Sequence, residues 1–134
     1  MRTLLCVTLI GLPPTVNHLY RTSVRGVRYK TKAGKVWQEN TALMLRTAWG
    51  GKPSLSREDG IFLRVLFMMG NERVWDMDNR LKVLQDCLQM AGIVRDDRDI
   101  DHLWVDRERG RAGDATEVSV GTMRDAEGYV SQGS

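Results

Sequence analysis

Cysteine and histidine are scarce in this chain of 134 residues, which contains two of each. Cys6 and Cys87 form neither a metal-binding spacing nor a disulfide framework. His18 and His102 are far apart, so the sequence excludes a local His/Cys zinc site and carries no local signature of a Ser-His-Asp triad. We therefore expect two structural thiols in a reducing compartment.

Long apolar runs are also lacking, and none approaches the roughly 20 residues that a membrane-spanning helix needs. Residues 1–12 are apolar at their centre, but they alternate, carry one Arg and have no small-residue cleavage site. This segment is predicted to be a strand, so we expect no membrane partner and a cytoplasmic location. The sequence has no Walker A motif either, which excludes a P-loop NTPase.

The composition is that of one globular domain, with 42% hydrophobic and 28% charged residues. We expect this domain to span residues 1–123 and a flexible C-terminal tail to span residues 124–134. Strands are predicted at residues 3–10, 27–31, 61–69, 100–107 and 115–120, and helices at residues 35–49 and 79–91. The order predicts an α+β fold, a single domain with a mixed β-sheet whose two main helices cover one face.

Local signals add four details to this outline. Residues 14–28 are predicted to form a loop, and Ala33-Gly34 a turn. Gly50-Gly51 and Gly92 are placed to end the two helices, and Asp78 to cap the first turn of the second helix. The last two predicted strands are joined by a polar, Gly-containing stretch, which favours an antiparallel hairpin.

Charge is distributed unevenly along the sequence. Residues 1–57 carry a net charge of +9 and residues 58–134 a net charge of −6. A basic half that attracts phosphates and an acidic half that can hold metal would suit a nucleic-acid enzyme. A solvated surface of mixed sign is the alternative interpretation.

The acidic half contains a cluster of aspartates. Asp76 and Asp78 stand two residues apart in a segment interpreted as extended, where both would project from the same side and share a metal. Mg²⁺ prefers oxygen ligands, and Asp97 or its neighbour Asp96 would supply a third carboxylate. In phosphodiester hydrolysis such a metal activates water and stabilises the leaving oxygen. An isolated Asp-x-Asp pair is also common in turns and helix caps, and the spacing does not fit an EF-hand.

Lys82 follows Asp78 by four residues, and Asp86 follows Lys82 by four, so one helical face carries acid, base and acid. An ammonium group beside a metal site can neutralise charge that builds on the scissile phosphate, and Asp86 can orient it. The alternative is a pair of ordinary surface ion pairs, each contributing about 0.3 to 0.5 kcal/mol.

Taken together, these residues resemble a known family. Pro13-Pro14 is followed by Asn17 and Tyr20, then by Asp76-x-Asp78-Asn79-x-x-Lys82-x-x-x-Asp86 and Gly92-x-x-x-Asp96-Asp97. In this order, over nearly the whole domain, the chain is similar to the RusA family of Holliday-junction resolvases.

That resemblance implies a RusA-like fold and a homodimeric, Mg²⁺-dependent endodeoxyribonuclease, with Mn²⁺ as a possible substitute ion. Such a hydrolase resolves branched DNA, the four-way junction, by paired symmetric nicks in recombination and repair, and it is often encoded by phages and prophages of bacteria. The implied metal ligands are Asp76, Asp78 and Asp97, the implied catalytic amine is Lys82, and the supporting residues are Asp86, Asp96 and Asn79.

The predicted DNA contacts depart from the family pattern in one respect. Family members often have basic residues just before the first motif aspartate, whereas here that segment offers only Arg73. A basic loop can compensate by holding the DNA arms through phosphate contacts. The predicted contacts are Asn17, Tyr20, Arg21, Arg25, Arg28, Lys30, Lys32, Lys35, Arg73 and Trp75. We expect Trp75 or Tyr20 to stack on an unpaired base, with core packing as the rival role.

Helix length suggests how the site is assembled. A straight helix from Asp78 to Gly92 is about 21 Å long, whereas the five residues from Gly92 to Asp97 can return at most about 18 Å. Asp97 would therefore meet Asp78 more comfortably from a second subunit, unless the helix ends a turn early. A two-fold dimer also suits a junction that is cut at two symmetry-related phosphates.

Two other functions remain compatible with the sequence. One is a non-catalytic DNA-binding module that uses only the basic half. The other is a metal-dependent hydrolase of small phosphorylated substrates, which would show no salt-dependent affinity for DNA.

Overall fold

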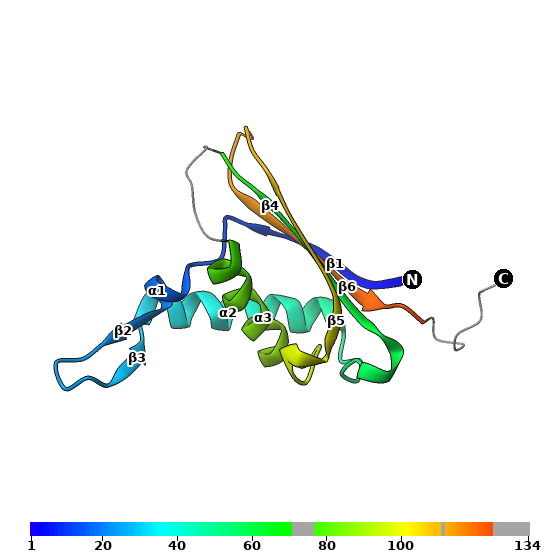
Figure 1. The fold of residues 1–134 in the computed structure, drawn as a ribbon, viewed down its shortest axis with the longest axis horizontal. Coiled ribbons are helices and arrows are strands. Elements are labelled where there is room, and N and C mark those ends of the chain that lie inside the picture. The colour runs from blue at the N-terminus through cyan, green and yellow to red at the C-terminus, as the bar shows by residue number, and fades with distance from the viewer. Residues whose placement is uncertain (71–76, 111, 125–134) are drawn as a thin grey trace.

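A four-stranded mixed sheet and two long helices make up the body of the protein (Figure 1). The computed structural model describes residues 1–70, 77–110 and 112–124. The sheet contains β1 (Arg2–Ile10), β4 (Ile61–Met68), β5 (Ile100–Glu108) and β6 (Ala115–Thr122) in the order β1-β6-β4-β5. The helices α2 (Lys32–Trp49) and α3 (Met77–Met90) lie on one face of it. The predicted α+β class with a mixed sheet is confirmed.

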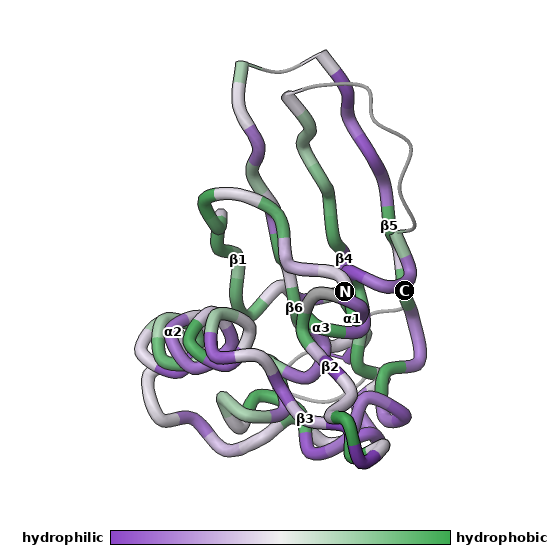
Figure 2. The backbone as a smooth tube through the Cα atoms, turned by 90° about the vertical axis from the view of Figure 1, so that its left-hand side faces the viewer, coloured by the Kyte–Doolittle hydropathy of each residue, from purple (hydrophilic) through white to green (hydrophobic). Residues whose placement is uncertain are grey.

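Strand β4 lies inside the sheet and is the most hydrophobic of the four strands, as its colour in Figure 2 shows. It pairs in parallel with β5 and antiparallel with β6. The segment from β4 through α3 to β5 is thus a β-α-β unit, which is the usual way to connect parallel strands. The predicted hairpin of the last two strands is wrong, because β5 and β6 lie on opposite sides of β4.

The hydrophobic core lies between the sheet and the two helices. Alternate residues of β4, namely Ile61, Leu63, Val65 and Phe67, point into it, as expected from the two-residue period of a strand. They meet Leu45 and Trp49 of α2 and Leu84 and Leu88 of α3. This packing holds α3, and the charged residues on its other face, in a fixed position against the sheet.

Gly121 of β6 allows the opposite face of the sheet to pack closely. A methyl group at this position would lie 1.9 Å from the carbonyl oxygen of Arg2 and 2.7 Å from the ring of Phe62. The Phe62 side chain is fully buried, so neither neighbour can move away without breaking β-sheet contacts.

Replacing Gly121 by Ala should therefore lower the free energy of unfolding by about 3 kcal/mol or more, because the added methyl group overlaps backbone atoms. The measurement is chemical denaturation followed by circular dichroism. Gly113→Ala is the matched control, since a methyl group there meets no atom within 4 Å. Equal denaturation midpoints for the two variants would contradict this account of the packing.

The first long helix begins earlier than the sequence indicates. Thr31 is its N-cap, and the Thr31 hydroxyl oxygen accepts a hydrogen bond of 3.0 Å from the backbone N–H of Gly34. The turn predicted at Ala33-Gly34 is therefore wrong, since both residues belong to α2. The predicted end is confirmed, because Gly50 adopts a φ of 74° and its N–H donates to the carbonyl of Arg46.

The predicted loop at residues 14–28 has regular structure. It contains the short helix α1 (Val16–Leu19) and the strand β2 (Tyr20–Thr22), which pairs antiparallel with β3 (Arg28–Lys30). Together β2, β3 and their connecting turn form a hairpin that projects from the body of the protein (Figure 1). We call residues 20–30 the arm.

Two short 3₁₀ helices, η1 (Arg57–Asp59) and η2 (Asp97–Asp99), complete the fold. In the part of the chain that the structure describes, no helix is long and apolar enough to cross a membrane. Most of the tail predicted at residues 124–134 lies outside the described residues. Arg124 is the described residue of that segment, and its N–H donates to the carbonyl of Asp59 at 3.1 Å.

Candidate active site

One face of α3 carries the charged residues that the sequence places at four-residue intervals. Asp78 and Lys82 are exposed and Asp86 is half-buried, whereas Leu81 and Leu84 face the core. Each four-residue step turns the helix by only about 40°, so the three charged side chains follow one another along its surface. The predicted order of acid, base and acid along one face is confirmed.

The helix itself begins at Met77, which changes the position expected for Asp78. Asp78 is a residue of the first helical turn and not the cap that precedes it. The extended segment predicted for Asp76 and Asp78 is wrong at Asp78 for the same reason. A carboxylate in the first turn is favoured by the positive end of the helix dipole. Asp76, Arg73 and Trp75 lie outside the described residues.

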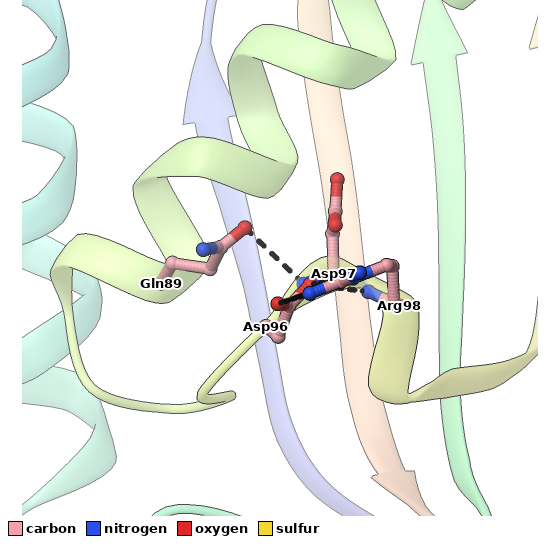
Figure 3. A network of polar contacts seen from close by, with 4 residues as sticks. All are labelled: Gln89, Asp96, Asp97 and Arg98. Atoms are coloured by element: carbon pink, nitrogen blue, oxygen red, sulfur yellow. Dashed lines mark hydrogen bonds and ion pairs between the residues drawn. The ribbon is translucent and has the colours of Figure 1, made fainter.

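Asp96 and Asp97 precede β5, where they differ in role. Asp96 is the N-cap of η2, and its carboxylate accepts a hydrogen bond of 2.9 Å from the backbone N–H of Arg98. The same carboxylate forms an ion pair of 2.9 Å with the Arg98 guanidinium group. These hydrogen bonds hold the pKa of Asp96 well below its usual value. Figure 3 shows Asp97 beside this pair, and its side chain also contributes to the lowered pKa of Asp96.

Asp97 lies beside the C-terminal half of α3. Its backbone N–H donates a hydrogen bond of 3.2 Å to the side-chain oxygen of Gln89 (Figure 3), and its negative charge acts on Asp86. Asp86 is eight residues beyond Asp78, so about 12 Å of helix separates their levels. Within one chain, Asp97 is anchored to Gln89 near the end of α3, whereas Asp78 lies in the first turn of that helix.

Burial and several charged groups act on the pKa of the Asp86 carboxyl group. Burial raises its pKa, while the ammonium groups of Lys82 and Lys30 act in the opposite direction and Asp97 adds to the increase. Lys30 belongs to β3 at the base of the arm, where it pairs with Tyr20, the residue that follows α1. The charge of Lys30 also acts on Cys87, although burial dominates there and raises the pKa of that thiol to about 12. Cys87 is therefore a buried thiol of the core.

Sequence reasoning missed two polar contacts that position the site. Gln89 anchors the backbone of Asp97, and Arg80 donates a hydrogen bond to the carbonyl oxygen of Pro13. The second contact joins the first turns of α3 to the loop at Pro13-Pro14, 67 residues earlier in the sequence. Both contacts depend on tertiary packing, and neither has a local sequence signal.

The basic residues predicted to bind DNA are gathered on and near the arm. All six of the predicted lysines and arginines between residues 21 and 35 are exposed, and so is Asn17 of α1. The guanidinium group of Arg28 lies 4.1 Å from the centre of the Tyr20 ring, a cation–π contact. One side of that ring is thus covered by Arg28, which leaves less of Tyr20 for stacking on a base.

The donor set of the predicted metal site consists of carboxylates, which suits a hard divalent cation such as Mg²⁺. Among the described residues, no group of three or more Asp, Glu, His or Cys side chains is close enough to hold a metal ion. Asp76, the third proposed ligand, lies outside the described residues.

Comparison with known proteins identifies the family. No curated protein matches the chain at a significant level. The model of the family described as Endodeoxyribonuclease RusA matches residues 11–121, which include the arm, α3 and the Asp96-Asp97 turn. The match covers well over half of the chain, and the chain therefore belongs to the RusA family of endodeoxyribonucleases.

Proposed function

We propose that this protein is a homodimeric, Mg²⁺-dependent endonuclease that resolves four-way DNA junctions by paired symmetric nicks. The observation that carries the proposal is the charged face of α3, where Asp78, Lys82 and Asp86 lie in a row with Asp97 and the base of a basic arm beside them. Family membership favours this function over a non-catalytic DNA-binding module and over a hydrolase of small phosphorylated substrates.

The proposed metal ligands are Asp76, Asp78 and Asp97, because an all-oxygen donor set fits Mg²⁺, and Mn²⁺ prefers the same ligand type. The bound ion would supply activation of the attacking water and stabilisation of charge on the leaving oxygen. Lys82 lies one helical turn from Asp78, so its ammonium group would neutralise charge on the scissile phosphate. Asp86, one turn further, would orient Lys82, and Asn79 and Asp96 would support the two ligand segments.

The positions of the ligand segments along α3 support the proposed homodimer. Asp78 lies in the first turn of α3, whereas Gln89, which anchors the backbone of Asp97, lies eleven residues further along the helix; two ligands of one Mg²⁺ ion each lie about 2.1 Å from it. A two-fold dimer that places Asp97 of one subunit beside Asp78 of the other would bring both ligands together and give two equivalent sites. We expect such an enzyme to act in DNA recombination and repair in the cytoplasm.

Incubation with a synthetic four-way junction should give paired nicks when Mg²⁺ is present and none when EDTA is added. A linear duplex of the same sequence should be cut at least about a hundredfold more slowly, since only the junction engages both sites. Binding should weaken steeply as salt rises, because the arm contacts phosphates. Junction binding without cleavage would indicate a binding module, and salt-independent binding would indicate a small-molecule hydrolase.

A further inference from the structure

The tip of the arm exposes two apolar side chains. Val24 is fully exposed, and 60% of the surface of Val27 is exposed to solvent. Both residues lie in or beside the turn that joins β2 to β3. Neither belongs to the hydrophobic core, so folding gains little from the burial of either side chain.

The turn does not require valines. The N–H of Gly26 donates to the carbonyl of Ser23 at 2.9 Å, and the N–H of Ser23 donates to the carbonyl of Val27 at 2.8 Å. The Ser23 hydroxyl oxygen also accepts a hydrogen bond from the N–H of Val27. Gly26 supplies the positive φ of 80° that a three-residue hairpin loop with a bulge needs. A β-branched residue at Val24 is uncommon in such a turn, where polar residues and Gly dominate.

The charge of the arm indicates the partner of this apolar tip. Arg21, Arg25, Arg28 and Lys30 are all exposed on the arm, and the first acidic residue of the whole sequence is Glu39. The arm contains no acidic residue, and a run of cations of this kind suits a polyanion. The arm also begins directly after α1, which packs against α3, the helix of the proposed active site. A polyanion bound along the arm can therefore extend to the active site.

We infer that Val24 and Val27 form an apolar wedge that enters the base stack of junction DNA, while the basic residues of the arm hold the phosphates on either side. This inference rests on the proposed function. Apolar side chains that insert between base steps unstack them and kink the duplex. The tip lies about 13 Å from Lys30 along the strands. If the arm follows the DNA from the active site, this length corresponds to about four base steps.

The test is a fluorescent base analogue, 2-aminopurine, placed at successive positions of a synthetic four-way junction and bound by the protein in EDTA. Wild-type protein should raise the fluorescence most at about four base steps from the nick site, because unstacked bases are less quenched. The double variant Val24→Ser/Val27→Ser should lose most of this rise and bind about fivefold more weakly. Its salt dependence should be unchanged, since no phosphate contact is removed.

Two controls separate the wedge from general effects of mutation. Val36→Ser changes an exposed valine of α2 outside the arm and should leave the fluorescence rise intact. Arg25→Gln should reduce the slope of log affinity against log salt by about 1 while the rise persists. Circular dichroism should show all three variants folded, since each change is on the surface.

An unchanged fluorescence rise in the double variant, from a protein whose wild-type form binds and nicks the junction, would overturn the wedge and leave the proposed function standing. A wild-type protein that neither binds nor nicks the junction would overturn both. Valine-dependent binding to anionic vesicles, with base unstacking unchanged by the double variant, would assign the tip to a lipid surface and also overturn the wedge.

Discussion

Replacing Asp97 by Asn should lower the rate of junction cleavage by about a thousandfold or more while junction binding in EDTA stays within about twofold of the wild type. The variant keeps the size of the side chain and removes only the negative charge. The hydrogen bond between Asp97 and Gln89 involves the backbone N–H of Asp97, so it survives the substitution. The change in the free energy of unfolding should stay within about 0.5 kcal/mol.

Two neighbouring aspartates provide controls for this experiment. Asp101→Asn removes an exposed carboxylate from β5, four residues further along, and should leave cleavage near the wild-type rate. Asp96→Asn removes the carboxylate that pairs with Arg98, so it should loosen the turn and reduce cleavage much less than Asp97→Asn. Cleavage by Asp97→Asn at more than about a tenth of the wild-type rate would remove Asp97 from the proposed ligands.

The parts of the fold that were predicted correctly have a strong local pattern. The run from Ile61 to Met68 is almost entirely apolar, and it forms a strand in which Arg64 is the exposed residue and every residue that faces the helices is buried. Leu81, Leu84 and Leu88 recur at steps of three and four, and α3 buries that face. For both elements, the local pattern and the tertiary environment favour the same structure, so the sequence alone is sufficient.

Strand pairing could not be predicted in the same way. The stretch between the last two strands contains Gly110 and Gly113, which suits a hairpin turn, but β6 pairs instead with β1 and β4. The central strand β4 needs a partner on each side, and β5 occupies one side through the parallel connection across α3. The choice of partner therefore depends on contacts between distant segments, which local pattern does not encode.

The charged residues of the site on α3 were predictable from the sequence, whereas the segments that surround this helix were not. The spacing of Asp78, Lys82 and Asp86 determines their common face once a helix is assumed. The position of Asp97 depends on Gln89, and the proximity of Lys30 depends on how the arm folds. Strands β2 and β3 have three residues each, which is too short for a clear periodic signal.

Because Lys82 and Asp78 share α3 while Asp97 belongs to the segment that Gln89 anchors, a site shared between subunits gives a specific result in mixed dimers. Asp78→Asn and Asp97→Asn proteins should each be inactive alone. A heterodimer of the two would contain one site with both substitutions and one intact site. Co-refolded mixtures contain about half heterodimers, so nicking should recover to about a quarter of the wild-type rate, on one strand per junction.

A second pair of variants distinguishes this recovery from simple stabilisation of one subunit by the other. Asp78→Asn and Lys82→Ala lie on the same helix, so each site of their heterodimer keeps one defect and nicking should not recover. A mixture of Asp97→Asn and Lys82→Ala should recover nicking to the same extent as the mixture of Asp78→Asn and Asp97→Asn. If neither mixture containing Asp97→Asn recovers, although tagged heterodimers can be purified, all ligands come from one chain. The first turn of α3 and η2 would then supply one site together, and any closure that this requires would shorten the distance between labels on the two elements.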